Sequence, residues 1–349
     1  MSSLFTPLTL GSITIPNRIG MSALTRNRST GTVPNEIMLK YYVQRAKGGA
    51  GLIGLNGPNV LGFGIKFRSK AGGKLPTLSM KLEVKFMLSF GIVSLTLIPV
   101  FLRPIIMLAA GVPVYAPSAI AAQGGRFRLL PGEPGYVTPT EIADPTPLIA
   151  QFKQAAINAK EAGFDGVEFH GANGYLVHQF LDSTSNHRTD QWGGSPENRA
   201  RFALETLKEL IAVWGPDVSL KLSPAGGYND MGMPLQDTID TFGYLLREVD
   251  NMGLSYVALV RFDEEDDGPR GTAHDVVETF RPFLTKTALF VNSSVTPAEG
   301  EELVKSGKAA GVFMGMNWLT HPDVARRIKE GKELDNAPDF KSFYGRGRC

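Results

Sequence analysis

Hydrophobic residues recur at helical spacing and then in short runs throughout the second half of the chain. Residues 147 to 164 place Leu148, Phe152 and Ala159 on one stripe, which predicts an amphipathic helix that ends at Gly163. The apolar run GVEFHGA follows directly and is expected to form a strand. Helices that alternate with apolar strand runs are typical of a parallel sheet whose two faces are both buried.

The same unit recurs four more times before the end of the chain. The helix over 195–215 is expected to begin with Ser195 as its cap and Pro196 in its first turn, and the strand SLKLSP follows it. Three further helix and strand pairs follow in the same order: TIDTFGYLLREVDNMG with YVALVR, VVETFRPFL with LFVNSS, and EGEELVKSG with GVFMGM. These runs predict five consecutive units.

The N-terminal part adds two more units of the same kind. LGSITIPNRI reads as a short hairpin, IGMSAL as a first strand, NEIMLKYYVQRAKGG as a helix and GLIGLN as a second strand. Two units before residue 58 and five after residue 145 leave one missing from the eight that close a barrel. We therefore expect an α/β fold, a (β/α)8 TIM barrel with an N-terminal β-hairpin, in a single domain spanning residues 1–349, with rim loops at 27–37 and 121–140.

The third unit, at about residues 58–110, is atypical. Residues 87–112 contain one charge, Arg103, and the charge-free run from Phe86 to Leu102 includes Gly91 and Pro99. That run sits at the lower limit of length for a hydrocarbon core of about 30 Å. A membrane span inside a barrel is one explanation of this run. We favour the other explanation, that the sequence of the third unit has been misread.

Charge and cysteine content narrow the class of partner. The chain has 36 basic and 34 acidic residues, a net charge of +2, and no basic arm or acidic tail. We expect small-molecule partners, with neither nucleic acid nor membrane, and leave open whether the chain forms a homodimer. The single cysteine is Cys349, and the first residues have no leader pattern, so we expect a cytoplasmic protein.

Polar residues follow most of the predicted strands, where barrel enzymes place their reactive groups. His170 and Asn173 follow one strand and can present two donors to one acceptor, and Tyr175 beside them is a plausible proton donor. Each could alone simply satisfy a strand end, but together they favour addition to an activated double bond. The remaining strand-end candidates are Thr25, Lys221, Arg261, Ser293, Ser294 and Gly315.

Other polar groups receive a simpler interpretation. His178 and His187 are irregularly spaced from His170 and have no accompanying cysteine, so we read them as solvated loop histidines and expect no metal site. Arg261 and the acidic run DEEDD read as a solvated loop that could line a substrate entrance.

The run HGANGYLVHQFLDSTSNHRTDQWGGSPENRARF closely resembles the signature of the old yellow enzyme family, and the similarity extends over about residues 4–57 and from about 111 onward. The resemblance implies FMN across the barrel mouth. Hydride would pass from NAD(P)H through the flavin to the β-carbon of an α,β-unsaturated carbonyl compound, an enone. It implies that His170 and Asn173 hold the carbonyl oxygen and Tyr175 protonates the α-carbon. The flavin-binding positions it implies are Ala23, Thr25 at the O4 edge, Lys221, Ser293 and Gly315.

Three positions depart from the family pattern, and each weakens flavin binding. Lys221 stands where the family has an arginine near the flavin N1/O2 edge, which keeps the charge but loses the planar fork. Met316 replaces the phosphate-binding arginine, which removes a partner worth roughly 1.5–3 kcal/mol. NSSV replaces a glycine-rich turn, which restricts close backbone approach.

The family's third unit ends in a strand resembling QLWH, and residues 58–110 contain nothing similar. Moving the reading frame back one base allows Thr77 to Ile92 to be decoded as DAVHEAGGEVYAQLWH, a helix end, a glycine stop and a strand. Our hypothesis is that part of this segment is out of frame. A coding sequence whose shifted frame does not encode that peptide would exclude it. The alternative function is a flavin-deficient, inactive barrel, a pseudoenzyme or the product of a damaged gene.

Overall fold

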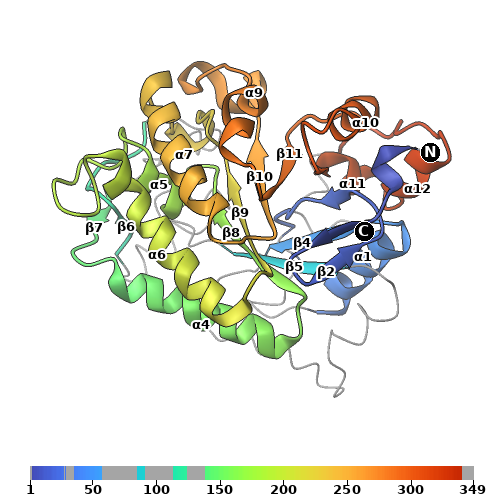
Figure 1. The fold of residues 1–349 in the computed structure, drawn as a ribbon, viewed down its shortest axis with the longest axis horizontal. Coiled ribbons are helices and arrows are strands. Elements are labelled where there is room, and N and C mark those ends of the chain that lie inside the picture. The colour runs from blue at the N-terminus through green and yellow to red at the C-terminus, as the bar shows by residue number, and fades with distance from the viewer. Residues whose placement is uncertain are drawn as a thin grey trace.

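Eight parallel strands form a closed barrel in the computed structural model (Figure 1), which describes residues 2–26, 28, 35–56, 85–90, 113–123 and 138–339. Around the barrel the order is β10, β11, β12, β3, β4, β5, β8 and β9. The expected TIM-barrel fold is confirmed. The strands are β3 (Ile19–Met21), β4 (Leu52–Asn56), β5 (Lys85–Phe90), β8 (Gly166–Gly171), β9 (Val218–Leu222), β10 (Tyr256–Val260), β11 (Ala288–Asn292) and β12 (Gly311–Met314).

Helices pack around the outside of the barrel, and Figure 1 shows α4, α6 and α7 lying side by side along one flank. Two predicted boundaries are confirmed: the Ser195 hydroxyl accepts the Asn198 N–H, and Gly163 ends α4 with a left-handed φ of 83°. The helices are α1 (Glu36–Lys47), α4 (Thr146–Ala162), α5 (Leu176–Leu181), α6 (Pro196–Trp214), α7 (Leu235–Asp250), α8 (Glu264–Asp267), α9 (Val276–Phe280), α10 (Pro297–Lys305), α11 (Met316–Thr320) and α12 (Val324–Lys329).

The predicted hairpin plugs the barrel at the end where the strands begin. Its strands β1 (Leu8–Leu10) and β2 (Ile13–Ile15) pair antiparallel. Leu10 and Ile15 are almost fully buried, and they belong to one apolar cluster with Tyr256 and Phe290 inside the barrel. Because this end is closed by hydrophobic packing, the opposite end, where the strands finish, is left for chemistry.

The first and last units of the chain pair with each other. β12 pairs with β3, with Val312 opposite Ile19, and this pairing closes the barrel. The Glu301 carboxylate on α10 accepts backbone N–H groups from Ser3, at 2.7 Å, and Leu4, at 3.2 Å. The N-terminal turn η1 (Ser3–Phe5) is thereby fixed to α10.

The atypical segment supplies the third strand. β5 pairs with β4, with Leu88 opposite Leu55, and with β8, where Leu88 lies opposite Val167. The barrel therefore has a strand of unfamiliar sequence in its third place rather than an unpaired edge. The rest of residues 58–110, including the helix expected there, lies outside the described residues. Among the helices that the structure describes, none is long and apolar enough to cross a membrane.

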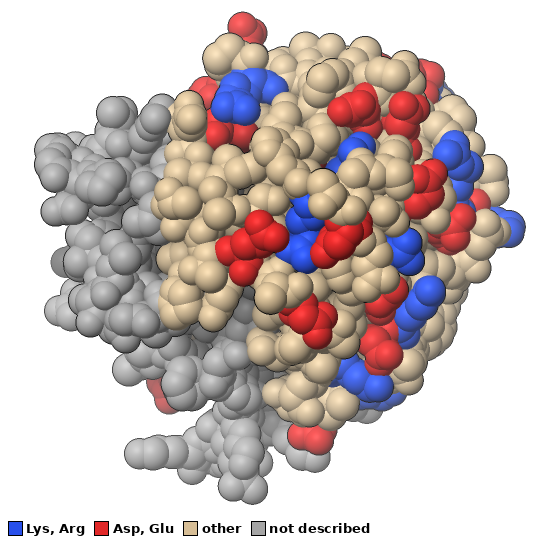
Figure 2. Space-filling view, turned by 90° about the vertical axis from the view of Figure 1, so that its left-hand side faces the viewer, with Lys and Arg blue, Asp and Glu red and all other residues tan. Residues whose placement is uncertain are grey.

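A short sheet lies outside the barrel. β6 (Tyr115–Ala116) pairs parallel with β7 (Thr140–Glu141), so the loop expected over 121–140 ends in a strand. On the face shown in Figure 2, acidic and basic side chains are interspersed, and neither sign forms a continuous patch. This distribution matches the near balance of charges in the sequence.

Candidate active site

The end of β8 and the turn after it bring together the three predicted catalytic residues. The rings of His170 and Tyr175 lie 5.0 Å apart between centroids, at an interplanar angle of 64°. Asn173 lies between them with a left-handed φ of 58°. His170 on β8, and Asn173 and Tyr175 just after it, therefore lie together at the open end of the barrel.

Neighbouring elements fix this turn from two sides. The Asn173 N–H donates to the Ser223 hydroxyl at 2.7 Å, and the Asn173 carbonyl accepts from the Asn229 amide at 2.9 Å. The next N–H, from Gly174, donates to His178 Nδ1 at 3.0 Å. Asparagine adopts the αL conformation more readily than most residues, and these bonds fix the turn in that conformation. Nothing in the sequence pattern indicated the supporting roles of Ser223 and Asn229.

His170 has a buried polar atom without a partner. Its Nδ1 atom forms no hydrogen bond with any residue in the described part of the chain. Burial, together with the positive charge of Lys221 and with His178, lowers the pKa of His170 to about 3. The imidazole is therefore neutral near pH 7, with one nitrogen that donates and one that accepts.

His178 is not the solvated loop histidine that the sequence suggested. It lies on α5, is 1% exposed, and accepts the Gly174 N–H. Burial lowers its pKa to about 4, although the Asp182 charge opposes that change. The sequence interpretation failed because α5 is a short helix with apolar residues on all sides. His187 is exposed, as expected.

Lys221 lies beside His170, because the two residues are register partners on β9 and β8. Its residue surface is 8% exposed. Burial lowers the pKa of Lys221, and the Glu168 carboxylate opposes this by favouring the charged form. The barrel mouth thus contains a buried amine with one acidic neighbour beneath it.

Ala23, Thr25 and Gly315 follow the adjacent strands β3 and β12. The Ser22 N–H donates to the Met314 carbonyl at 3.0 Å, which keeps the two strand ends together. A Cβ built on Gly315 would lie 3.6 Å from the Leu24 side chain, an ordinary contact, so the backbone is uncrowded there. These three predicted positions lie on the part of the rim next to β11.

The turn after β11 keeps a backbone conformation that glycine favours, although its residues are serines. Ser293 has φ 83° and Ser294 has φ 50°. The Arg261 guanidinium donates to the Ser293 carbonyl at 3.0 Å and forms an ion pair with Glu299. The interpretation of Arg261 as a solvated loop residue was therefore wrong, since its charge is neutralised by a specific partner.

The acidic run is likewise more ordered than a solvated loop. It forms α8, and Asp263 caps this helix by accepting the Glu265 N–H. The Asp263 carboxylate also accepts the Ser294 hydroxyl at 2.5 Å. Met316, at the start of α11, is 40% exposed. This side of the mouth therefore presents carboxylates and an apolar side chain beside a neutralised arginine.

The described residues fit the ring of FMN better than its phosphate. The His170 Nδ1 atom, which has no partner among the described residues, and the buried Lys221 side chain place polar groups where a ring and a substrate would lie. At the other side, Arg261 is already paired with Glu299. Within the described residues we therefore assign ring contacts to Thr25, Ala23 and Lys221 as candidates. Ser293 and Gly315 are candidates for the phosphate end.

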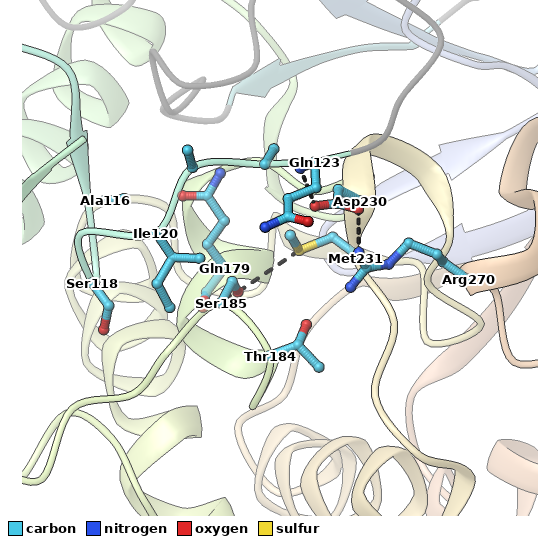
Figure 3. Close-up of a pocket in the computed structure, with 12 residues that line it drawn as sticks. Ala116, Ser118, Ile120, Gln123, Gln179, Thr184, Ser185, Asp230, Met231 and Arg270 are labelled. Atoms are coloured by element: carbon cyan, nitrogen blue, oxygen red, sulfur yellow. Dashed lines mark hydrogen bonds and ion pairs between the residues drawn. The ribbon is translucent and has the colours of Figure 1, made fainter. Parts of the chain in front are cut away.

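A pocket of about 310 Å³ is lined by none of the predicted site residues (Figure 3). The Asp230 carboxylate forms part of its wall, where it accepts the Gln123 N–H at 2.6 Å and pairs with Arg270 at 2.5 Å. Gln179 of α5 lines the pocket and donates to the Gly174 carbonyl at 2.8 Å. The sequence did not predict this pocket, because its lining comes from four separate segments.

Comparisons with known proteins agree with this architecture. Residues 3–71 and 119–335 match the NADH:flavin oxidoreductase / NADH oxidase family, and the intervening range overlaps the atypical third unit. Aldehyde reductase FrzD of a Cladobotryum species is 32% identical over 349 residues, with 95% of this chain and 89% of that protein covered. A probable inactive reductase, easA of Epichloe festucae var. lolii, is 37% identical over 62% of this chain and 59% of its own length.

Among solved structures, the old yellow enzyme homologue from Zymomonas mobilis has a TM-score of 0.84 and 27% sequence identity, and the alignment covers 99% of this chain and 97% of that chain. The match therefore includes the closed barrel and its rim. FMN and NAD(P)H are the cofactors of this group of enzymes. From the matched residues and the shared barrel, the chain belongs to the NADH:flavin oxidoreductase / NADH oxidase family, the old yellow enzyme family of FMN-dependent oxidoreductases.

Proposed function

We propose that this chain is an ene-reductase that uses NAD(P)H to reduce the activated C=C bond of α,β-unsaturated carbonyl compounds, within one domain spanning residues 1–349. The observation that carries the proposal is the braced turn after β8, where His170, Asn173 and Tyr175 gather around an unsatisfied imidazole nitrogen. The proposal keeps the expected cytoplasmic location and small-molecule partner as predictions.

Each residue of the turn has a distinct task in this proposal. His170 and Asn173 donate hydrogen bonds to the substrate carbonyl oxygen, which draws electron density away from the β-carbon. Tyr175 delivers a proton from its hydroxyl to the α-carbon. A phenol suits this task because its reference pKa near 10 keeps it protonated at neutral pH. When bound, FMN supplies the hydride relay between NAD(P)H and the β-carbon.

The substrate we favour is an α,β-unsaturated aldehyde. One observation supports this choice over a ketone: the relative FrzD is named an aldehyde reductase. Ser293, Gly315, Ala23 and Thr25 are proposed as cofactor contacts on the rim beside β11, β12 and β3.

The inactive barrel is the second candidate function. Met316 and the pairing of Arg261 with Glu299 favour it, because both leave the phosphate side without a free cation among the described residues. The relative easA, named a probable inactive reductase, provides a precedent. We prefer the active enzyme, because His170, Asn173 and Tyr175, the residues that the proposed chemistry needs, are all present at the end of β8 and after it.

Purification of the chain as written, followed by absorbance spectroscopy, separates the two functions. The active enzyme is expected to carry flavin absorbance that NADPH bleaches and cinnamaldehyde restores. Colourless protein that takes up no added FMN would contradict the proposal. A parallel variant in which residues 77–92 are replaced by DAVHEAGGEVYAQLWH tests the reading frame. If only that variant binds FMN, the family assignment holds, and the third unit with its present sequence is what prevents FMN binding.

A further inference from the structure

A buried carboxylate lies within the barrel beneath the proposed flavin site. Glu168 on β8 is 4% exposed, and Tyr256 on β10 is 1% exposed. The Tyr256 hydroxyl donates to Glu168 Oε2 at 2.8 Å. A carboxylate this deep in a barrel costs free energy unless a compensating charge lies nearby. The proposed function assigns no task to this pair.

The strand register places Glu168 one inward-facing position below the site. Glu168 lies opposite Ser219, and His170 lies opposite Lys221. Because side chains alternate along a strand, Glu168 and His170 share the inner face of β8, and Ser219 and Lys221 share that of β9. The carboxylate is thus in the layer directly under the Lys221 amine.

The groups around Lys221 differ in charge. On β8 they are the neutral imidazole of His170 and the carboxylate of Glu168. On β10 the register partner is Ala258, and burial and the Glu168 charge raise the pKa of Tyr256 well above its usual value, so that its phenol is also neutral. From α5, the buried His178 has a pKa lowered to about 4 and is neutral too. Among these described groups, Glu168 carries the negative charge.

We propose that Glu168, oriented by the Tyr256 hydroxyl, is a positioning residue that keeps the Lys221 amine at the barrel mouth protonated. The inference rests on the proposed function, in which Lys221 faces the flavin. A lysine can lose its proton on burial, whereas an arginine cannot. A chain that uses lysine here therefore needs a neighbouring negative charge, and Glu168 supplies it.

The first test measures the Lys221 pKa in the flavin-free protein, by NMR of 13Cε-labelled lysine with Lys221→Arg used to assign the signal. We expect Glu168→Gln to lower that pKa by about one unit or more, because an opposite charge at close range shifts a pKa by roughly one to three units. Glu168→Asp, which keeps the charge, should restore most of the difference. A Lys221 pKa unchanged by Glu168→Gln would overturn the proposal.

The second test follows FMN binding by fluorescence quenching from pH 6 to pH 9. In Glu168→Gln, the dissociation constant should rise by up to about tenfold per pH unit above the lowered Lys221 pKa. In the Lys221→Arg background, Glu168→Gln should leave the pH profile flat. If Glu168→Gln weakens binding equally at every pH in both backgrounds, its role is structural and the proposal fails.

A third measurement covers the case in which Glu168→Gln folds poorly. If Glu168 and Lys221 compensate each other, Lys221→Met strands a buried carboxylate, and adding Glu168→Gln should raise the melting temperature by about 3 °C or more. A double variant that melts below Lys221→Met would contradict the pairing. Failure of FMN to bind at any pH would refute the proposed function, while the lysine titration would still decide this inference.

Discussion

The two sides of the barrel mouth differ in what they share with the family: one side keeps its side chains, and the other keeps its backbone conformation. On the side of β8, the side chains match the family signature, and Asn173 is held in place because it donates to the Ser223 hydroxyl and accepts from the Asn229 amide. On the side of β10 to β12, the backbone keeps left-handed residues at Ser293 and Ser294 although their side chains differ. A fold can therefore preserve the shape of a site after the side chains that once suited that shape have changed.

The largest expected effect tests the β8 side. Tyr175→Phe should lower turnover with an unsaturated aldehyde by about 10²- to 10⁴-fold, because the proton donor to the α-carbon is lost. Reduction of the flavin by NADPH should be unchanged, which stopped-flow absorbance can follow separately. Tyr115→Phe, at an exposed tyrosine of β6, is the matched control and should retain full turnover. Equal turnover in the two variants would remove Tyr175 from the mechanism.

The next effect tests the β12 side by restoring a charge. Met316→Arg should tighten FMN binding by about ten- to a hundredfold, the equivalent of roughly 1.5–3 kcal/mol for a charged hydrogen bond. Riboflavin, which lacks the phosphate, should bind with unchanged affinity. Met316→Leu controls for loss of the thioether. If FMN and riboflavin gained affinity together, the new arginine would be acting on the ring or on the fold.

Acid sensitivity should come from the β8 side. The folded-state pKa of His170, about 3, lies below its unfolded value near 6.5, so the unfolded chain binds the proton first. Stability that is present above pH 6.5 is therefore lost as the pH falls toward 3. The free energy of unfolding, measured with urea at pH 7, 6, 5 and 4, should fall less steeply with pH for His170→Asn than for the wild type. His187→Asn, at an exposed imidazole, should follow the wild type, and a parallel loss in both variants would exclude His170 as the source.

The smallest effect tests the strain stored in the turn after β11. Ser293→Gly should stabilise the fold by about 1 kcal/mol, because a φ of 83° is costly for a residue with a Cβ. Ser306→Gly is the control, since Ser306 has φ −76° and gains nothing from glycine. Denaturant midpoints measure both. A Ser293→Gly variant no more stable than wild type would show that the turn tolerates serine without strain.

Sequence patterns predicted the barrel well because local signals and packing agree. Ser195 and Gly163 mark helix ends by their own chemistry, and seven of the strands are apolar runs in predicted places. The residues as written do not indicate the third strand; only the shifted reading frame predicted a strand at the end of residues 77–92, and β5 lies there. His170, Asn173 and Tyr175 could be grouped because they lie on one turn.

The rest of the site depends on contacts between distant residues. Nothing beside Arg261 in the sequence indicates its partner Glu299, and nothing beside Asp230 indicates the Gln123 N–H that it accepts. The φ angles of Ser293 and Ser294 were also hidden, since serine is not a residue that favours the left-handed region. Such features are set by tertiary packing rather than by local preference.

The pairing of β12 with β3 also governs how the chain is made. One edge of β3 pairs with β4, but its other edge pairs with the last strand of the barrel, where Ile19 lies opposite Val312. During synthesis β3 therefore keeps one open edge until nearly the whole chain has left the ribosome. We expect chaperones to bind nascent chains that stop before β12. We expect a chain to dissociate from the chaperone only after β12 has been synthesised and has paired with β3.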